Sequence, residues 1–148
     1  MDDHRSRSLP ELTGDVTCAE AREKARRVLD HLERDHLEPA PALLPERRED
    51  VLTVVSELIA NARRHAGGVT HFDIRVQRGA LVVEVSDRSP DGPLTRPWAP
   101  GRPGGFGWRL VEQLADRAHV HFHDDMKTVN AVFFTGSGVP PPPPAGTP

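Results

Sequence analysis

The sequence predicts an α+β domain of two layers, in which a mixed, mostly antiparallel sheet carries helices on one face. Apolar residues recur at helical spacing before residue 66 and alternate with polar residues after it. The predicted strands come in pairs joined by short turns, and the helices are grouped. Proline and glycine concentrate in two later segments. We therefore expect an N-terminal extension over 1–15, a packed domain over 16–135 and a disordered proline-rich tail over 136–148.

A first long helix is predicted to begin after Thr17. Thr17 has the residue type of an N-cap, and Glu20 stands three residues later, as in a capping box. Pro39 and Pro41 are expected to end this helix. A short edge strand is expected before it, near Leu9–Leu12. The apolar positions at helical spacing are Ala21, Ala25, Val28, Leu29 and Leu32.

A second helix is predicted from Pro45 to about Ala66. Pro45 suits the first turn of a helix, and Gly67-Gly68 suits its end. At 100° per residue this helix has an apolar arc and a polar arc. The apolar arc contains Val51, Val55, Leu58, Ile59 and Ala62, and the polar arc contains Asp50, Glu57, Asn61 and Arg64. Glu57 and Asn61 lie one turn apart and could act on one ligand, although a solvated face has the same spacing.

The hydrophobic period changes to two after Gly68. Residues 71–77 alternate polar with apolar, Arg78-Gly79 predicts a tight turn, and 81–85 continue as a strand. These segments predict a β-hairpin.

A third helix and two more strands are predicted after an irregular segment. Residues 87–105 are dense in proline and glycine. Residues 106–116 have a helical apolar pattern, and strands are expected over 118–123 and 128–134.

Charge and composition exclude several classes of protein. Lys+Arg 19 against Asp+Glu 22 gives a net charge of −3, so no broad basic surface for nucleic acid is expected. No window approaches the roughly 18 apolar residues of a membrane span. Cys18 is the single cysteine, which suits a reducing compartment, and a cytoplasmic location is expected. The two lysines, Lys24 and Lys127, lie in no P-loop motif.

Two further features have chemistry suited to a nucleotide. Asp87 ends an apolar strand, where its carboxylate can accept a hydrogen bond from an exocyclic amine, although aspartate is also a common turn starter. Gly104-Gly105-Phe106-Gly107-Trp108 leads into the third helix. Glycines and the free N–H groups of a helix start can bind phosphate without a lysine.

Together these segments resemble the conserved boxes of the histidine-kinase-like ATPase superfamily, the Bergerat fold shared by gyrase B and histidine kinases. Ser56–Ala66 looks like the N-box, Val85–Pro90 resembles the first glycine box, and Gly105–Trp108 resembles the second. Within the superfamily, the sequence is most similar to the stand-alone serine/threonine kinases of actinobacteria that act as anti-sigma factors. It departs from the family pattern in the first glycine box, which lacks the usual glycines.

The resemblance implies ATP and Mg²⁺ as cofactors and assigns roles to individual residues. It makes Glu57 the general base and Asn61 a magnesium ligand. Asp87 would read adenine, and Thr128 would be a contact on the adenine side. The residues it implies for cofactor binding are Asn61, Asp87, Gly105, Gly107 and Thr128, with the two glycines in a lid over the phosphates.

The resemblance also implies a function and partners. The chain would phosphorylate an anti-anti-sigma antagonist of the STAS type and otherwise sequester a sigma factor, with no direct contact to nucleic acid or membrane. Related kinases commonly dimerise, so a homodimer is compatible with it. The alternatives are a catalytically inactive, nucleotide-dependent binding module, or a metal-binding or structural α+β domain. A sensor histidine kinase fragment is disfavoured because only one helix precedes the ATPase-like region.

The histidines allow further interpretations. His119, His121 and His123 alternate along one predicted strand, so they share a face that is either solvated or able to bind Zn²⁺. His65 follows the N-box-like segment and is expected to cap or pack, with a nucleotide contact as the alternative. Trp98, in the segment between the two glycine boxes, has no assigned role.

Overall fold

The computed structural model describes residues 10–34, 45–88 and 107–135. The elements in chain order are β1 (Leu12–Thr13), α1 (Cys18–Arg34), α2 (Pro45–Ala66), β2 (Val69–Gln77), β3 (Ala80–Asp87), α3 (Gly107–Leu114), β4 (Arg117–His123) and β5 (Met126–Phe134). The predicted order of helices and strands is confirmed, and the expected edge strand is β1, slightly later than predicted. The predicted tail and most of the expected lid lie outside the described residues.

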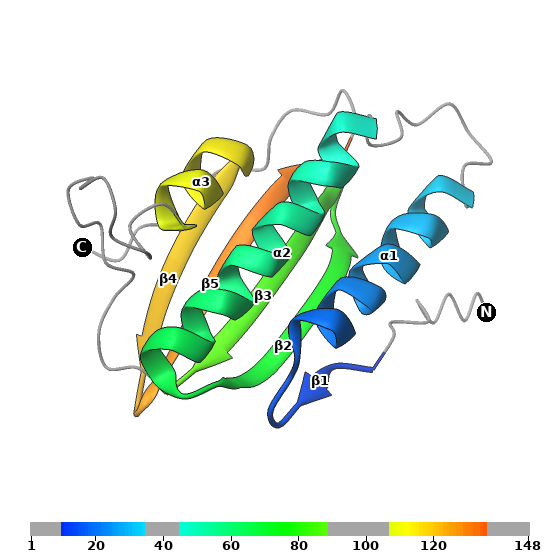
Figure 1. Ribbon diagram of the computed structural model, residues 1–148. Helices are drawn as coiled ribbons and strands as arrows, with labels where there is room; N and C mark the ends of the chain where they lie inside the picture. The colour runs from blue at the N-terminus through cyan, green and yellow to red at the C-terminus, as the bar shows by residue number, and fades with distance from the viewer. Residues whose placement is uncertain (1–9, 35–44, 89–106, 136–148) are drawn as a thin grey trace, which may run out of the picture.

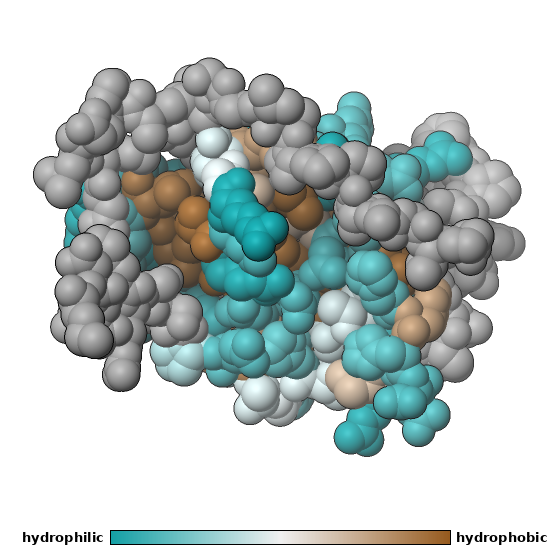
Figure 2. Space-filling view, turned by 180° about the vertical axis from the view of Figure 1, so that it is seen from behind, coloured by the Kyte–Doolittle hydropathy of each residue, from teal (hydrophilic) through white to brown (hydrophobic). Residues whose placement is uncertain are grey.

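The strands form one sheet in the order β1-β2-β3-β5-β4, and every pair of neighbours is antiparallel. Figure 1 shows α1, α2 and α3 on the same face of this sheet, with α2 running across its middle. The predicted two-layer α+β fold is confirmed. The opposite face carries both polar and apolar side chains (Figure 2).

The hydrophobic core lies between the helices and the sheet. All five residues of the predicted apolar arc of α2 are at most 3% exposed. They pack against the strand residues whose side chains point to the same side, which are Phe72, Ile74, Leu81, Val83, Val85, Val129, Ala131 and Phe133. Burial of this apolar surface is the main stabilising contribution to such a fold.

Local signals define the ends of the two long helices. The Oγ1 atom of Thr17 accepts a hydrogen bond from the backbone N–H of Glu20 at 3.1 Å, which confirms the N-cap. Gly67 and Gly68 have φ values of 72° and 139°, which confirms the glycine stop of α2. Pro39 and Pro41, the predicted end of the first helix, lie outside the described residues, and α1 is described to Arg34.

The β2–β3 hairpin has the tight turn that the sequence predicts. Arg78 and Gly79 have φ values of 50° and 75°, and a type I′ turn requires positive values at both central residues. The turn also joins the end of β5, because the Thr135 N–H donates to the Gly79 carbonyl oxygen at 2.8 Å. The β4–β5 turn likewise places Asp124 at a φ of 52°.

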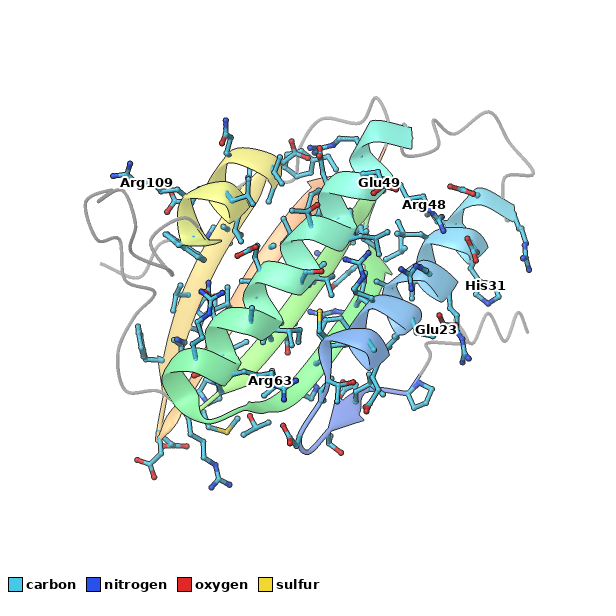
Figure 3. The ribbon with its side chains drawn as sticks, in the orientation of Figure 1. Glu23, His31, Arg48, Glu49, Arg63 and Arg109 are labelled. Carbon is cyan, nitrogen blue, oxygen red and sulfur yellow. The ribbon has the colours of Figure 1, made fainter. Side chains whose placement is uncertain are left out.

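Two adjacent arginines tie α2 to the helices on either side of it. Arg48 donates to Asp30 Oδ1 at 2.8 Å and to Glu33 Oε1 at 3.2 Å on α1, and Figure 3 shows it between the two helices. Arg47 donates to the Leu114 carbonyl oxygen at 2.8 Å, at the end of α3, and also bonds the Asp116 carboxylate. Helix α2 is therefore anchored from both sides.

A buried ion pair ties α1 to the sheet. Lys24 Nζ donates to Asp73 Oδ1 at 2.9 Å, and the two side chains are 5% and 8% exposed. Arg75 donates to the other carboxylate oxygen at 3.2 Å and to Glu84 Oε2 at 3.1 Å. Burial by itself raises the pKa of Asp73, but the hydrogen bonds and charges of Lys24 and Arg75 outweigh it, so the pKa lies below its usual value.

Candidate functional site

Glu57 and Asn61 lie on the C-terminal half of α2, one helical turn apart. Both side chains are half-buried, in contrast to the buried residues of the apolar arc. Ser56, beside Glu57, donates to the Leu52 carbonyl oxygen at 2.9 Å and accepts from Arg22 of α1 at 2.7 Å. The helix therefore presents a carboxylate and an amide from a backbone segment that is held in place.

Asp87 is the last residue of β3 and is only 2% exposed. Its cross-strand neighbours are Val69 on β2 and Lys127 on β5. Figure 1 shows that β3 ends at the same end of the sheet as the C-terminus of α2. The fold thus brings Asp87 to the end of the domain that carries Asn61, although 26 positions separate them in the sequence.

Lys127 stands directly beside Asp87. Its Nζ atom is 3.4 Å from Asp87 Oδ2, and the side chains of Lys127 and Asp87 are 8% and 4% exposed. The pair lies on the helix-covered face, because Val85 and Val129 form the next cross-strand pair of the same parity and belong to the core. The sequence motifs do not predict that Lys127 pairs with Asp87.

Thr128, by contrast, points to the opposite face of the sheet from Asp87. It pairs across the strands with Ser86, and the two hydroxyl oxygens are 2.8 Å apart. His123 Nε2 is 3.2 Å from the same Thr128 oxygen. The structure therefore does not bring Thr128 and Asp87 together on one face. A sequence signal for this existed, because Val129, Ala131 and Phe133 alternate with Thr128 and mark the buried parity of β5.

The structure describes the glycine-rich segment only from Gly107 onward. Gly107 is the first residue of α3, and Gly105 lies outside the described residues. Trp108 follows Gly107, is half-buried and packs against the core. Within the described chain, Gly107 therefore has the predicted position at a helix start, where backbone N–H groups and the helix dipole favour an anion.

The donor set of this site suits magnesium better than zinc. Across residues 10–34, 45–88 and 107–135, no group of three or more His, Cys, Asp or Glu side chains could hold a metal ion. His119, His121 and His123 therefore form no zinc site there, and the rings of the first two are 6.4 Å apart. Mg²⁺ takes one or two protein oxygen ligands and completes its shell with water and phosphate, so the half-buried amide of Asn61 fits it.

Comparison with known families agrees with this geometry. The sequence profile described as "Histidine kinase-like ATPase domain" matches residues 16–133, which span α1 to β5 and include all three boxes. The chain belongs to this family. Domains of the family bind ATP, and the match covers almost all of the predicted packed domain. No curated protein matches the chain. No helix within the described segments is long and apolar enough to cross a membrane.

Solved structures of low sequence identity share the family fold. A chain of the SiaB-SiaC complex from Pseudomonas aeruginosa is similar with a TM-score of 0.57 and 15% identity, over 87% of this chain and 91% of that one. The histidine kinase AdeS from Acinetobacter baumannii is similar with a TM-score of 0.50 and 14% identity, over 88% of this chain and 69% of that one. At these identities the likeness establishes the fold.

Proposed function

We propose that this chain is a cytoplasmic protein serine/threonine kinase that acts as an anti-sigma factor. It transfers the γ-phosphoryl group of ATP to an anti-anti-sigma antagonist of the STAS type and sequesters a sigma factor when the antagonist is absent. The observation that carries the proposal is the pair Glu57 and Asn61 on α2, at the same end of the fold as the buried Asp87, in a chain of the histidine kinase-like ATPase family.

Each residue has a distinct task in this proposal. The Glu57 carboxylate accepts the proton of the attacking hydroxyl group, and the Asp87 carboxylate accepts a hydrogen bond from the adenine amine. The Asn61 amide oxygen would hold Mg²⁺, and the bound ion would neutralise charge on the phosphates. Backbone N–H groups at Gly107, together with the Gly105 segment, bind the phosphates. The Thr128 hydroxyl supports the strand end through Ser86, next to Asp87.

The identity of the partners rests on the resemblance of the boxes to anti-sigma factor kinases. The similar chain from Pseudomonas aeruginosa belongs to a complex of two proteins, SiaB and SiaC, which supports partner binding as a use of this fold. A homodimer is compatible with the same proposal. The alternative is a binding module that responds to nucleotide but transfers no phosphate.

Phosphoryl transfer tests the proposal directly. The protein is incubated with radiolabelled ATP, Mg²⁺ and a panel of STAS-domain antagonists, and labelled Ser or Thr is identified after electrophoresis. Transfer should fall at least about a hundredfold in Glu57→Gln, because a positioned general base contributes about 10²- to 10⁴-fold. Glu49→Gln is the matched control, since Glu49 is exposed and lies on the same helix.

The possible outcomes separate the two functions. Binding of ATP without transfer to any antagonist would favour the binding module, and absence of ATP binding would refute both. Binding can be followed by intrinsic fluorescence, because the chain has two tryptophans and no tyrosine. Trp108 lies next to Gly107, so we expect ATP to change its emission.

A further inference from the structure

Lys127 belongs to the Lys127-Thr128-Val129 segment that also resembles the family, but the resemblance gives it no role. The protein has two lysines among its 19 basic residues, and each is buried against an aspartate. Lys24 joins α1 to the sheet by a hydrogen bond of 2.9 Å to Asp73. Lys127 lies instead at the end of the sheet, with Nζ 3.4 Å from Asp87 Oδ2. Its partner is the carboxylate to which the proposed function gives the task of reading adenine.

The pair combines a hydrogen-bond donor and an acceptor next to apolar residues. Val85 and Val129 form the next cross-strand pair on the same face of the sheet, and at 2% and 5% exposed they make the interior beside the two charged groups apolar. Asp87 supplies a hydrogen-bond acceptor and Lys127 supplies a donor, side by side. A carboxylate has two oxygens with about four acceptor directions, and an ammonium group has three donors. Groups with several donor or acceptor directions can take part in more than one hydrogen bond.

We propose that Lys127 also recognises the base. It donates a hydrogen bond to a ring nitrogen next to the exocyclic amine of adenine, and Asp87 accepts a hydrogen bond from that amine. This inference rests on the proposed function and deepens it. In adenine the exocyclic amine is a donor, and the ring nitrogens N1 and N7 flanking it are acceptors. The Asp87–Lys127 pair offers the complementary acceptor and donor.

In the pose that places the exocyclic group of the base against Asp87, the same pair disfavours guanine. Guanine carries a carbonyl oxygen in place of the amine, so an acceptor faces the Asp87 carboxylate. Its N1 atom carries a hydrogen, so in one of the two orientations a donor also faces the Lys127 ammonium. Buried polar groups left without a suitable partner discriminate strongly between substrates. Guanine has to shift so that its N1–H faces Asp87 and its carbonyl oxygen faces Lys127, and the pair therefore favours ATP over GTP where the site holds the base in the adenine pose.

Nucleotide analogues that lack one ring nitrogen test the proposal on the full chain. Dissociation constants are measured by calorimetry for ATP, 1-deaza-ATP, 7-deaza-ATP and GTP. We expect the wild-type protein to bind one of the two deaza analogues about ten- to hundredfold more weakly than ATP, the effect of one hydrogen bond to a charged group. Which analogue is weakened identifies the ring nitrogen that Lys127 contacts. GTP should also bind more weakly than ATP, because guanine meets the pair only in a shifted position.

Variants at the two lysines complete the test. Lys127→Met should weaken ATP binding by a similar factor and bind ATP and the affected deaza analogue equally. Lys127→Gln, which keeps a neutral donor, should retain part of the discrimination and guards against loss of folding in the methionine variant. Lys24→Met is the matched control, because it also removes a buried lysine paired with an aspartate. It should discriminate between the analogues as the wild type does.

Two results would overturn the inference and can be told apart from failure of the proposed function. If the wild type binds ATP and both deaza analogues equally, no ring nitrogen is read. If Lys127→Met still distinguishes ATP from the deaza analogue, another group reads it, and Lys127 is a structural partner of Asp87. If the wild type does not bind ATP, the proposed function itself fails, and this inference fails with it.

Discussion

Replacing either member of the Lys24–Asp73 pair should destabilise the domain, and replacing both should cost less than the sum. Asp73→Asn leaves the Lys24 ammonium, 5% exposed, without its carboxylate. Loss of one partner of a buried pair costs about 3–5 kcal/mol, and we expect about 3 kcal/mol here. Lys24→Met should cost about 2 kcal/mol, since Arg75, at 3.2 Å, still neutralises part of the Asp73 charge.

The double variant separates pairing from packing. In the variant that combines Lys24→Met with Asp73→Asn, both charges of the pair are removed, so no buried charge is left without its partner. We expect the double variant to lose about 2 kcal/mol of unfolding free energy, which corresponds to a coupling energy of about 3 kcal/mol. Free energies of unfolding are measured by urea titration with circular dichroism. The control is Glu23→Gln, which breaks the exposed Glu23–Arg27 pair and should cost at most about 0.5 kcal/mol. Additive single effects, or a larger loss for Lys24→Met than for Asp73→Asn, would refute this reasoning.

Four further predictions concern Asp73, Arg47 and Arg48 of α2, Gly79 and Trp108. The pKa of Asp73 is lowered by folding, so its contribution is fully present above its unfolded pKa of about 3.9 and is lost as the pH falls through the lower folded value. Urea titrations from pH 6 to pH 2.5 should show a smaller acid loss in Asp73→Asn than in the wild type, and equal losses would contradict the lowered pKa. Arg47→Met should weaken ATP binding more than Arg48→Met, because Arg47 anchors α2 to the helix that begins at Gly107, whereas Arg48 anchors it to α1. The dissociation constants are measured by calorimetry, and equal effects of the two variants would argue against a role of Arg47 in positioning that helix for ATP. Gly79→Ala should cost about 1 kcal/mol in thermal unfolding, since the backbone φ is 75° and no atom lies closer than 3.9 Å to the added carbon. Trp108→Phe should abolish most of the ATP-dependent fluorescence change, and a full change in that variant would assign the signal to Trp98 instead.

Much of the fold is predictable because its signals are local. The burial of one arc of α2, its end at Gly67-Gly68, the Thr17 cap and the turn at Arg78-Gly79 each depend on residues a few positions apart. Helical and strand periods and turn residues act over such short distances. The order of elements and the position of Asp87 at a strand end follow from the same patterns.

The site is less predictable because its contacts join distant segments. The family resemblance assigns Thr128 to the adenine side, whereas the structure turns its hydroxyl to Ser86 on the other face. Strand alternation contained that information, because Val129 marks the buried parity and Lys127 shares it. The parity alone, however, does not say which residue of β3 stands opposite Lys127.

The sequence by itself determined the family, the helices and hairpins, and the residues Glu57, Asn61 and Asp87 as candidates. Only the tertiary structure decided which side chains lie beside them. The register between β3 and β5 set Lys127 beside Asp87, and the packing of α1 on the sheet set Lys24 beside Asp73, 49 positions away. Such pairings depend on how separate elements dock. Docking is decided by burial of the shared core, which no single stretch of sequence contains.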